Sequence, residues 1–172
     1  APPNYILVNA SALLAALLWI ALVPPVSGLK ARRTVTIALL ALLFLPMLTG
    51  PAVTGVTRWI PLGPMTIHAG MLAVPALTAL AARDPDYGAP ILLTALLAAF
   101  LQPDAATGFA LTFAAVAVHD VTKDWKIGVT AIIAFFASLV MAVRGELPPQ
   151  PFVERIFHDL IGASPLAATA LF

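Results

Sequence analysis

Long uncharged stretches alternate with short clusters of charged residues along this chain. A transmembrane helix needs about 20 consecutive apolar residues, with a range of roughly 17–25. Prolines and glycines at 24–25, 50–51 and 63–64 shorten the uncharged stretches, because these residues end helices and open turns. The pattern predicts six transmembrane helices, at residues 6–24, 34–50, 64–82, 88–102, 104–119 and 127–143.

The fold class predicted from this pattern is an all-α, polytopic helix bundle that forms one transmembrane domain over residues 1–172. Backbone groups in lipid need partners within the protein, so the spanning segments must be helices. The fourth and fifth spans are separated only by the turn around Pro103, which predicts a tight helical hairpin. Residues 144–172 are predicted to form an amphipathic segment on the outer face, either at the surface or re-entrant.

Composition supports the membrane prediction and excludes several classes of protein. Hydrophobic residues make up 61% of the 172 residues and charged residues 10%, against roughly 45–50% and about 25% in soluble domains. A chain of this length cannot bury so much apolar surface in one core, which excludes a soluble enzyme. A nucleic-acid partner is excluded because no basic face is present. The chain has no cysteine, so cysteine-based metal sites are excluded, and no metal or cofactor is assigned.

The distribution of lysine and arginine predicts the orientation in the membrane. Cytoplasmic loops carry an excess of these residues. The loops after the first, third and fifth spans hold six of them, and the opposite side holds Arg58, Arg144 and Arg155. We therefore expect a multi-pass protein of the cytoplasmic (inner) membrane with both termini on the outer face. The six cytoplasmic charges are Lys30, Arg32, Arg33, Arg83, Lys123 and Lys126.

Two outward-facing segments carry candidate chemistry. Residues 55–63 read Gly-Val-Thr-Arg-Trp-Ile-Pro-Leu-Gly. Arg58 and Trp59 either anchor the loop at the lipid headgroups or bind an anionic headgroup or pyrophosphate. Residues 102–107 read Gln-Pro-Asp-Ala-Ala-Thr. Asp104 either caps the fifth span or is a functional carboxylate at the edge of the hydrocarbon.

Together these two segments resemble two signatures of the SEDS family (RodA, FtsW and SpoVE), which polymerise lipid-linked peptidoglycan precursor in cell-wall and cell-shape synthesis. The first signature is Gly-x-x-Arg-Trp-(Ile/Leu)-x-Leu-Gly, and residues 55–63 match it. The second is Gln-Pro-Asp-x-Gly-Thr, which residues 102–107 match with Ala106 in place of glycine. The resemblance covers residues 5–143 and, less closely, residues 144–172. It implies a polyprenyl-pyrophosphate-linked substrate at the outer face. It implies substrate-binding roles for Arg58, Trp59 and Gln102.

The resemblance also implies a catalytic carboxylate. The family's presumed base lies in a His-Thr-Asp-Phe-Ile-Phe segment, over which residues 152–157 can be placed with Glu154 at the acid position. Glu154 and Asp104 are therefore the candidate catalytic residues, and Arg155 joins Arg58 as a candidate for binding the pyrophosphate. Transfer between sugars needs such a base and such a cation.

Departures from the family keep a second class of function open. Residues 68–71 read His-Ala-Gly-Met where the family has Gln-Pro-Ser-Glu, and the family's last helices have no counterpart. The alternative is a non-catalytic transmembrane subunit of a respiratory or photosynthetic complex, with other membrane subunits as partners. His68 and His119 are predicted on opposite faces, so they cannot share one haem, although a single histidine could bind a pigment.

Overall fold

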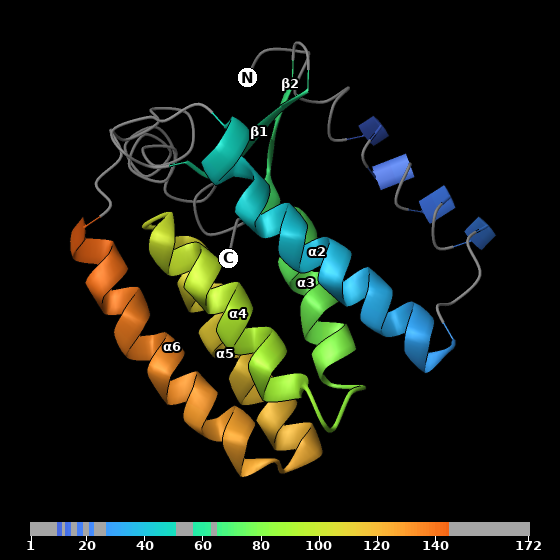
Figure 1. The fold of residues 1–172 in the computed structure, drawn as a ribbon, viewed down its shortest axis with the longest axis vertical. Coiled ribbons are helices and arrows are strands. Elements are labelled where there is room, and N and C mark those ends of the chain that lie inside the picture. The colour runs from blue at the N-terminus through green and yellow to red at the C-terminus, as the bar shows by residue number, and fades with distance from the viewer. Residues whose placement is uncertain are drawn as a thin grey trace, which may run out of the picture. The chain divides into compact units, whose positions relative to one another are not determined.

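The computed structural model describes residues 27–50, 57–62 and 65–144, with isolated helical positions between residues 10 and 22. The first predicted span, 6–24, and the predicted segment 144–172 therefore lie largely outside the described residues. The described elements belong to one compact unit, Ser27–Leu147, and Figure 1 shows their arrangement. In order they are α2 (Leu29–Thr49), β1 (Trp59–Leu62), β2 (Met65–His68), α3 (Ala69–Ala81), α4 (Gly88–Leu101), α5 (Ala105–Thr122) and α6 (Trp125–Arg144).

The described helices support membrane embedding but not the full set of six spans. Three of them, α2, α5 and α6, are long and apolar enough to cross a membrane. The other two, α3 and α4, have 13 and 14 residues. At a rise of 1.5 Å per residue they extend about 20 Å, which is less than the roughly 30 Å of a hydrocarbon core.

The described fold is mostly helical, but the predicted third span, 64–82, is wrong at its start. Residues 65–68 were predicted to begin the third span, but they form β2, which pairs antiparallel with β1. Pro61 and Pro64 disfavour a helix through this segment, and the β-branched Thr66 and Ile67 suit a strand. His68 then caps α3, because its Nδ1 accepts a hydrogen bond of 3.2 Å from the backbone N–H of Met71.

The other predicted helices match the structure closely. The fourth, fifth and sixth spans correspond to α4, α5 and α6 within three residues at each end. Helix α2 begins at Leu29, five residues before the predicted Thr34, so its first turns carry Lys30, Arg32 and Arg33. Charged side chains can reach water from a helix end without breaking the helix. The predicted limit therefore marked where the apolar residues begin, not where the helix begins.

Helices α5 and α6 approach closely at Gly108. A Cβ atom on Gly108 would lie 2.3 Å from Cε of Met141 and 2.5 Å from Oγ of Ser138. Small residues at such crossings allow helix backbones to pack together inside a membrane. Gly108 therefore leaves room for the Met141 and Ser138 side chains of α6.

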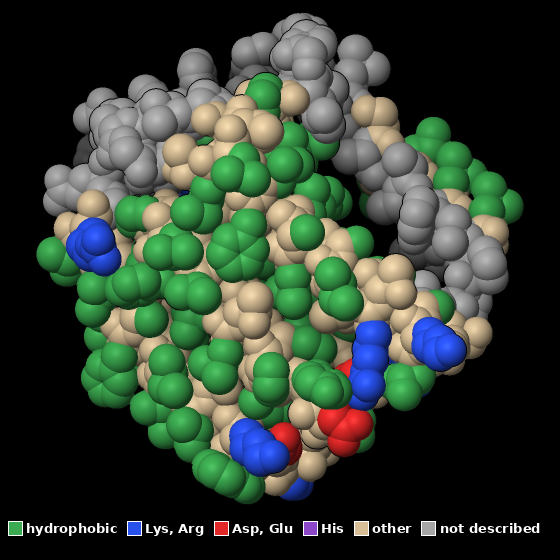
Figure 2. Space-filling view, in the orientation of Figure 1, with side chains coloured by type: hydrophobic (Ala, Val, Ile, Leu, Met, Phe, Trp, Pro, Cys, Tyr) green, Lys and Arg blue, Asp and Glu red, His purple; other side chains and the backbone are tan. Residues whose placement is uncertain are grey.

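The charged residues of the unit gather at its two ends. At one end, Arg33 at the start of α2 pairs with Asp84 in the α3–α4 turn, and Asp84 lines the same cavity as Asp124 in the α5–α6 turn. We call this the basic end. At the other, the Asp104 end, Arg58 pairs with Asp104. Between them, Figure 2 shows a face that is mostly hydrophobic, with charged side chains near its margins. The described charged residues named here are thus concentrated at the two ends of the unit.

Candidate functional site

The site at the Asp104 end is built on the turn between α4 and α5. Asp104 is the N-cap of α5 and is 1% exposed. Its carboxylate accepts hydrogen bonds from the backbone N–H of Thr107 at 3.3 Å and from Oγ1 of Thr107 at 2.5 Å. Such a cap satisfies amide donors that have no partner within the helix. The capping role predicted for Asp104 is therefore confirmed.

Two side chains from the hairpin meet the same carboxylate. Nη1 of Arg58 lies 3.0 Å from Oδ1 of Asp104, and Nε2 of His68 lies 3.2 Å from Oδ2. Arg58 directly precedes β1 and His68 ends β2, and the strand register places Trp59 opposite His68. The hairpin therefore delivers both groups to one point beside the α4–α5 turn.

The hydrogen bonds of His68 determine where its ring proton resides. Nδ1 accepts the N–H of Met71 and so carries no hydrogen. The proton of a neutral imidazole is then on Nε2, from which it donates to Asp104. One tautomer thus satisfies both the helix cap and the carboxylate.

Burial makes these contacts energetically important. The side chains of Asp104, His68 and Arg58 are 2%, 9% and 18% exposed. Attraction between charges is stronger away from water, and an unpaired buried charge is costly. Nε of Arg58 is buried and has no hydrogen-bond partner among the described residues. Both oxygens of the Asp104 carboxylate thus have partners, whereas the N–H at Nε of Arg58 is a donor that is not used among the described residues.

Trp59 and Gln102 border this cluster in different ways. The ring of Trp59 meets His68 edge-on at 5.1 Å between centroids, and the guanidinium of Arg58 lies 5.8 Å from the Trp59 ring centre, within reach of a cation–π interaction. Gln102 is buried, and its amide donates to the backbone carbonyl of Leu43 in α2. Gln102 therefore anchors the turn to α2.

The structure brings together three of the predicted site residues: Arg58, Trp59 and Asp104. Glu154 and Arg155 lie outside the described residues. Sequence reasoning missed His68 as a partner of Asp104, because it placed residues 64–82 in one helix. The signal was the Gly63-Pro64 pair, which marks a turn, with the β-branched Thr66 and Ile67 shortly after it.

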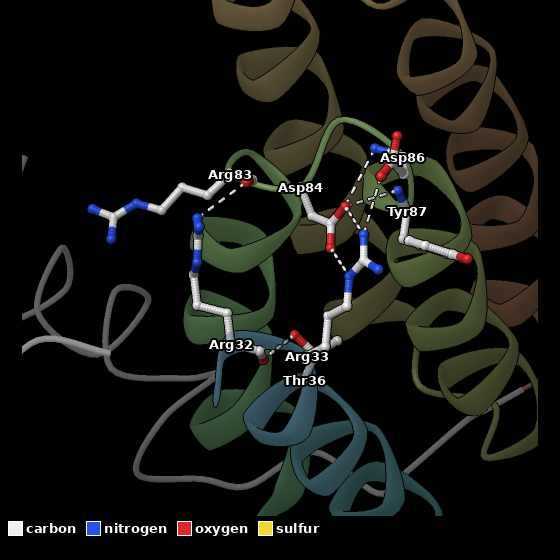
Figure 3. A network of polar contacts seen from close by, with 7 residues as sticks. All are labelled: Arg32, Arg33, Thr36, Arg83, Asp84, Asp86 and Tyr87. Atoms are coloured by element: carbon white, nitrogen blue, oxygen red, sulfur yellow. Dashed lines mark hydrogen bonds and ion pairs between the residues drawn. The ribbon is translucent and has the colours of Figure 1, made fainter. Parts of the chain in front are cut away.

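A second polar network occupies the basic end (Figure 3). Arg33 donates to Asp84 from Nε at 2.9 Å and from Nη2 at 3.2 Å, and Nη2 also reaches Asp86 at 3.1 Å. Asp84 also accepts the backbone N–H groups of Asp86 and Tyr87 at the start of α4. The hydrogen bonds from the Arg33 guanidinium hold the pKa of the Asp84 carboxyl below its usual range. This network joins α2 to the α3–α4 turn.

Within the described residues, no group of three or more histidine or acidic side chains is placed to bind a metal ion. Comparison with protein-family models, with curated proteins and with solved structures gives no match for this chain.

Proposed function

We propose that this chain is a SEDS-like membrane protein that binds a polyprenyl-pyrophosphate-linked sugar at the Asp104 end. The observation that carries the proposal is the ion pair between Arg58 and Asp104. It joins the two sequence segments that resemble SEDS signatures, although these residues are 46 positions apart in the chain. Two segments that are distant in the sequence, and that both resemble signatures of the same family, thus meet in one buried cluster, as the parts of a single site would.

The local chemistry supports binding of an anion by Arg58. A phosphate oxygen would compete with Asp104 for the guanidinium, because both are acceptors of charge-assisted hydrogen bonds. Asp104 would not lose all its partners in that exchange, since His68 and Thr107 also donate to it. Arg58 is the more exposed partner of the pair. The cluster can therefore offer Arg58 to a ligand while the turn stays capped.

This proposal assigns Asp104 the role of positioning Arg58. Asp104 is 1% exposed and accepts from Arg58, His68 and Thr107. A general base must reach the proton that it removes, and a buried, fully engaged carboxylate is poorly placed for this. Any transfer chemistry would then depend on Glu154, with Arg155 as a second cation.

Binding can be tested with polyprenyl pyrophosphate added to the purified chain in lipid nanodiscs. Tryptophan fluorescence is a suitable signal, because Trp59 lies next to Arg58. We expect Arg58→Gln to weaken binding roughly 10- to 150-fold, the range expected for losing a hydrogen bond to a charged group. Arg144→Gln is the matched control, since Arg144 is an exposed cation that stacks on Phe100 near the same end. We expect it to weaken binding about fivefold or less.

Equal affinities for the Arg58→Gln and Arg144→Gln variants would contradict the proposal. Because loss of Arg58 also leaves Asp104 without a cation, each variant's thermal midpoint should be measured in the same nanodiscs. Arg58→Lys keeps the positive charge but not the planar fork of donors. A folded Arg58→Lys variant with weakened binding would separate ligand recognition from folding.

Catalysis is tested separately by polymer formation from lipid-linked precursor in reconstituted vesicles. We expect Glu154→Gln to abolish the product while leaving the affinity for polyprenyl pyrophosphate unchanged. Unchanged product would remove Glu154 from the mechanism without affecting the binding proposal.

One observation favours the second function, a non-catalytic subunit of a larger membrane complex. The carboxylate of Asp104 is fully satisfied within the chain, so the cluster can serve packing alone. Native purification in mild detergent distinguishes the two functions. A stoichiometric, pigmented or redox-active complex would support the subunit role, and a single chain that retains isoprenoid lipid would support the envelope role.

A further inference from the structure

His68 is the second group, beside Arg58, that can place a positive charge next to the Asp104 carboxylate. Its Nε2 lies 3.2 Å from Oδ2 of Asp104, and its side chain is 9% exposed. Nδ1 accepts the backbone N–H of Met71 at 3.2 Å, so the ring is neutral in this arrangement. A second proton would enter at Nδ1 and would turn the contact with Asp104 into an ion pair.

The imidazole of His68 is held in place by close packing between the starts of α3 and α5. A Cβ atom on Gly70 would clash with Oγ1 of Thr107 and would lie 3.1 Å from Cε1 of His68. On the other side, the ring of Trp59 meets the imidazole edge-on, with 5.1 Å between centroids. The packing therefore keeps the imidazole beside Asp104.

Few charges face His68 among the described residues. Asp104 contacts it directly, and Arg58 lies across the same carboxylate. The last turn of α2 and the whole of α4 contain no charged residue, and Arg144 at the end of α6 stacks on Phe100. The N-termini of α3 and α5 add partial positive charge. With Arg58 they disfavour a second cation, so the free site holds one cation and one anion.

An anion bound to Arg58 would change this balance. A pyrophosphate oxygen that takes the guanidinium leaves the buried carboxylate of Asp104 with neutral donors only, from His68 and Thr107. A buried charge without an opposite charge is costly. A proton on Nδ1 of His68 would restore an opposite charge beside Asp104. The hydrogen bond given up is that of the Met71 N–H, which lies at an exposed position where water can replace it.

We propose that His68 is a positioning residue that takes up a proton when pyrophosphate binds to Arg58. The proton comes from solvent, and the imidazolium then neutralises Asp104, which frees the guanidinium of Arg58 for the ligand. Because protonation and binding are linked, each favours the other, and the affinity for the ligand rises as the pH falls. This role rests on the proposed function and adds a regulation by pH.

Proton uptake is measured by calorimetric titration of the full chain in nanodiscs with polyprenyl pyrophosphate, in buffers of different ionisation enthalpy. A pH of about 7.5 is suitable, because histidines change charge between about pH 5 and 8. We expect wild type to take up about half to one proton more than His68→Gln, whose amide can donate to Asp104 but cannot titrate. From pH 8 to pH 7, the affinity of wild type should rise about three- to tenfold relative to that variant, since about tenfold is the limit for one proton.

His119→Gln is the matched control, because His119 is a histidine in the last turn of α5, at the basic end. It should take up as many protons as wild type. His68→Asn keeps a side-chain oxygen that can cap α3 but carries no titrating ring, so it should lose the uptake as His68→Gln does. The thermal midpoint of each variant in the same nanodiscs shows whether it is folded.

The possible results distinguish this role of His68 from the proposed function. Equal proton uptake in wild type and the His68 variants would overturn the role and leave binding by Arg58 standing. Absence of saturable binding at every pH would overturn both. If neither variant folds, nitrogen NMR spectra of the wild-type His68 ring replace them. A ring that stays neutral with polyprenyl pyrophosphate bound would overturn the role, and an imidazolium would support it.

Discussion

Replacing Asp104 with alanine should be among the most destabilising single substitutions in the described unit. The change removes one partner of a buried ion pair, which costs about 3–5 kcal/mol because the other charge is left unpaired. Because 18% of the Arg58 side chain is exposed to solvent, the expected cost lies near the lower limit of this range. Loss of the helix cap adds about 1 kcal/mol. We therefore expect the free energy of unfolding to fall by about 4 kcal/mol, a large share of the 5–15 kcal/mol typical of a domain.

A double-mutant cycle separates the ion pair from the cap. In Arg58→Met the guanidinium is gone, so adding Asp104→Ala no longer leaves a buried cation. The double variant should be less destabilised than the sum of the two single variants, by more than about 1 kcal/mol. Asp104→Asn keeps an oxygen that can accept from Thr107, so it should cost less than Asp104→Ala.

The measurement is equilibrium unfolding in mixed micelles, followed by far-ultraviolet circular dichroism. Asp120→Ala is the matched control, because Asp120 lies on α5 and pairs with Lys123, the C-cap of that helix, but is 79% exposed. It should change the free energy of unfolding by about 0.5 kcal/mol or less. If Asp104→Ala costs no more than Asp120→Ala, or if Asp104→Ala and Arg58→Met are additive, the assigned energetic role of the cluster is wrong.

Three further predictions concern other contacts of the unit. The pKa of Asp84 is lowered by Arg33, so this pair should stabilise the fold above the ordinary aspartate pKa of about 3.9. That stabilisation is lost as the pH falls through the lowered pKa of Asp84 in the folded protein. The thermal midpoints of wild type and Asp84→Asn should therefore converge in strong acid. Gly108→Ala should lower the free energy of unfolding by about 1–3 kcal/mol, because the added Cβ would clash with side chains of α6. Equilibrium unfolding of the protein in mixed micelles measures this change. Gln102→Leu should lower it by about 1 kcal/mol in the same assay, because the hydrogen bond to α2 is lost.

Each of these predictions has a result that contradicts it. A constant difference in thermal midpoint between wild type and Asp84→Asn from pH 7 to strong acid would show that Asp84 does not act through its charge. Ala117→Leu, at an exposed position of α5, should be tolerated; a cost equal to that of Gly108→Ala would remove the packing argument. A neutral Gln102→Leu would show that the turn does not need its anchor on α2.

The helices were predictable because lipid imposes a simple rule on sequence. Charged residues are expensive in hydrocarbon, so gaps between charges mark helices, and α4, α5 and α6 lie where the gaps are. The rule fails where a helix extends past the apolar region, as α2 does through Lys30 and Arg33. It also fails where an uncharged stretch is not a helix, as in β1 and β2, because charge patterning does not distinguish strands from helices.

The candidate site was only partly predictable, for a related reason. Asp104 was identifiable as a cap, because its position before α5 is a local property of the sequence. Its contacts with Arg58 and His68 depend on the hairpin, and the prediction that residues 64–82 form one helix concealed that pairing. The residues were visible in the sequence, whereas their convergence depended on two strands that were not predicted.

The geometry of the cluster also explains why Asp104 cannot decide between the two functions, whereas Arg58 can. Asp104 caps α5 and fixes the hairpin, and its neighbour Gln102 ties the same turn to α2. Loss of Asp104 would therefore disturb folding whether the chain binds a lipid-linked sugar or serves only as a packing subunit. Arg58 is different, because it keeps exposed surface. Its replacement by lysine keeps a positive charge beside Asp104 but removes the fork that would hold a phosphate. A folded Arg58→Lys variant that binds polyprenyl pyrophosphate as tightly as wild type would leave the packing role as the better explanation of the cluster.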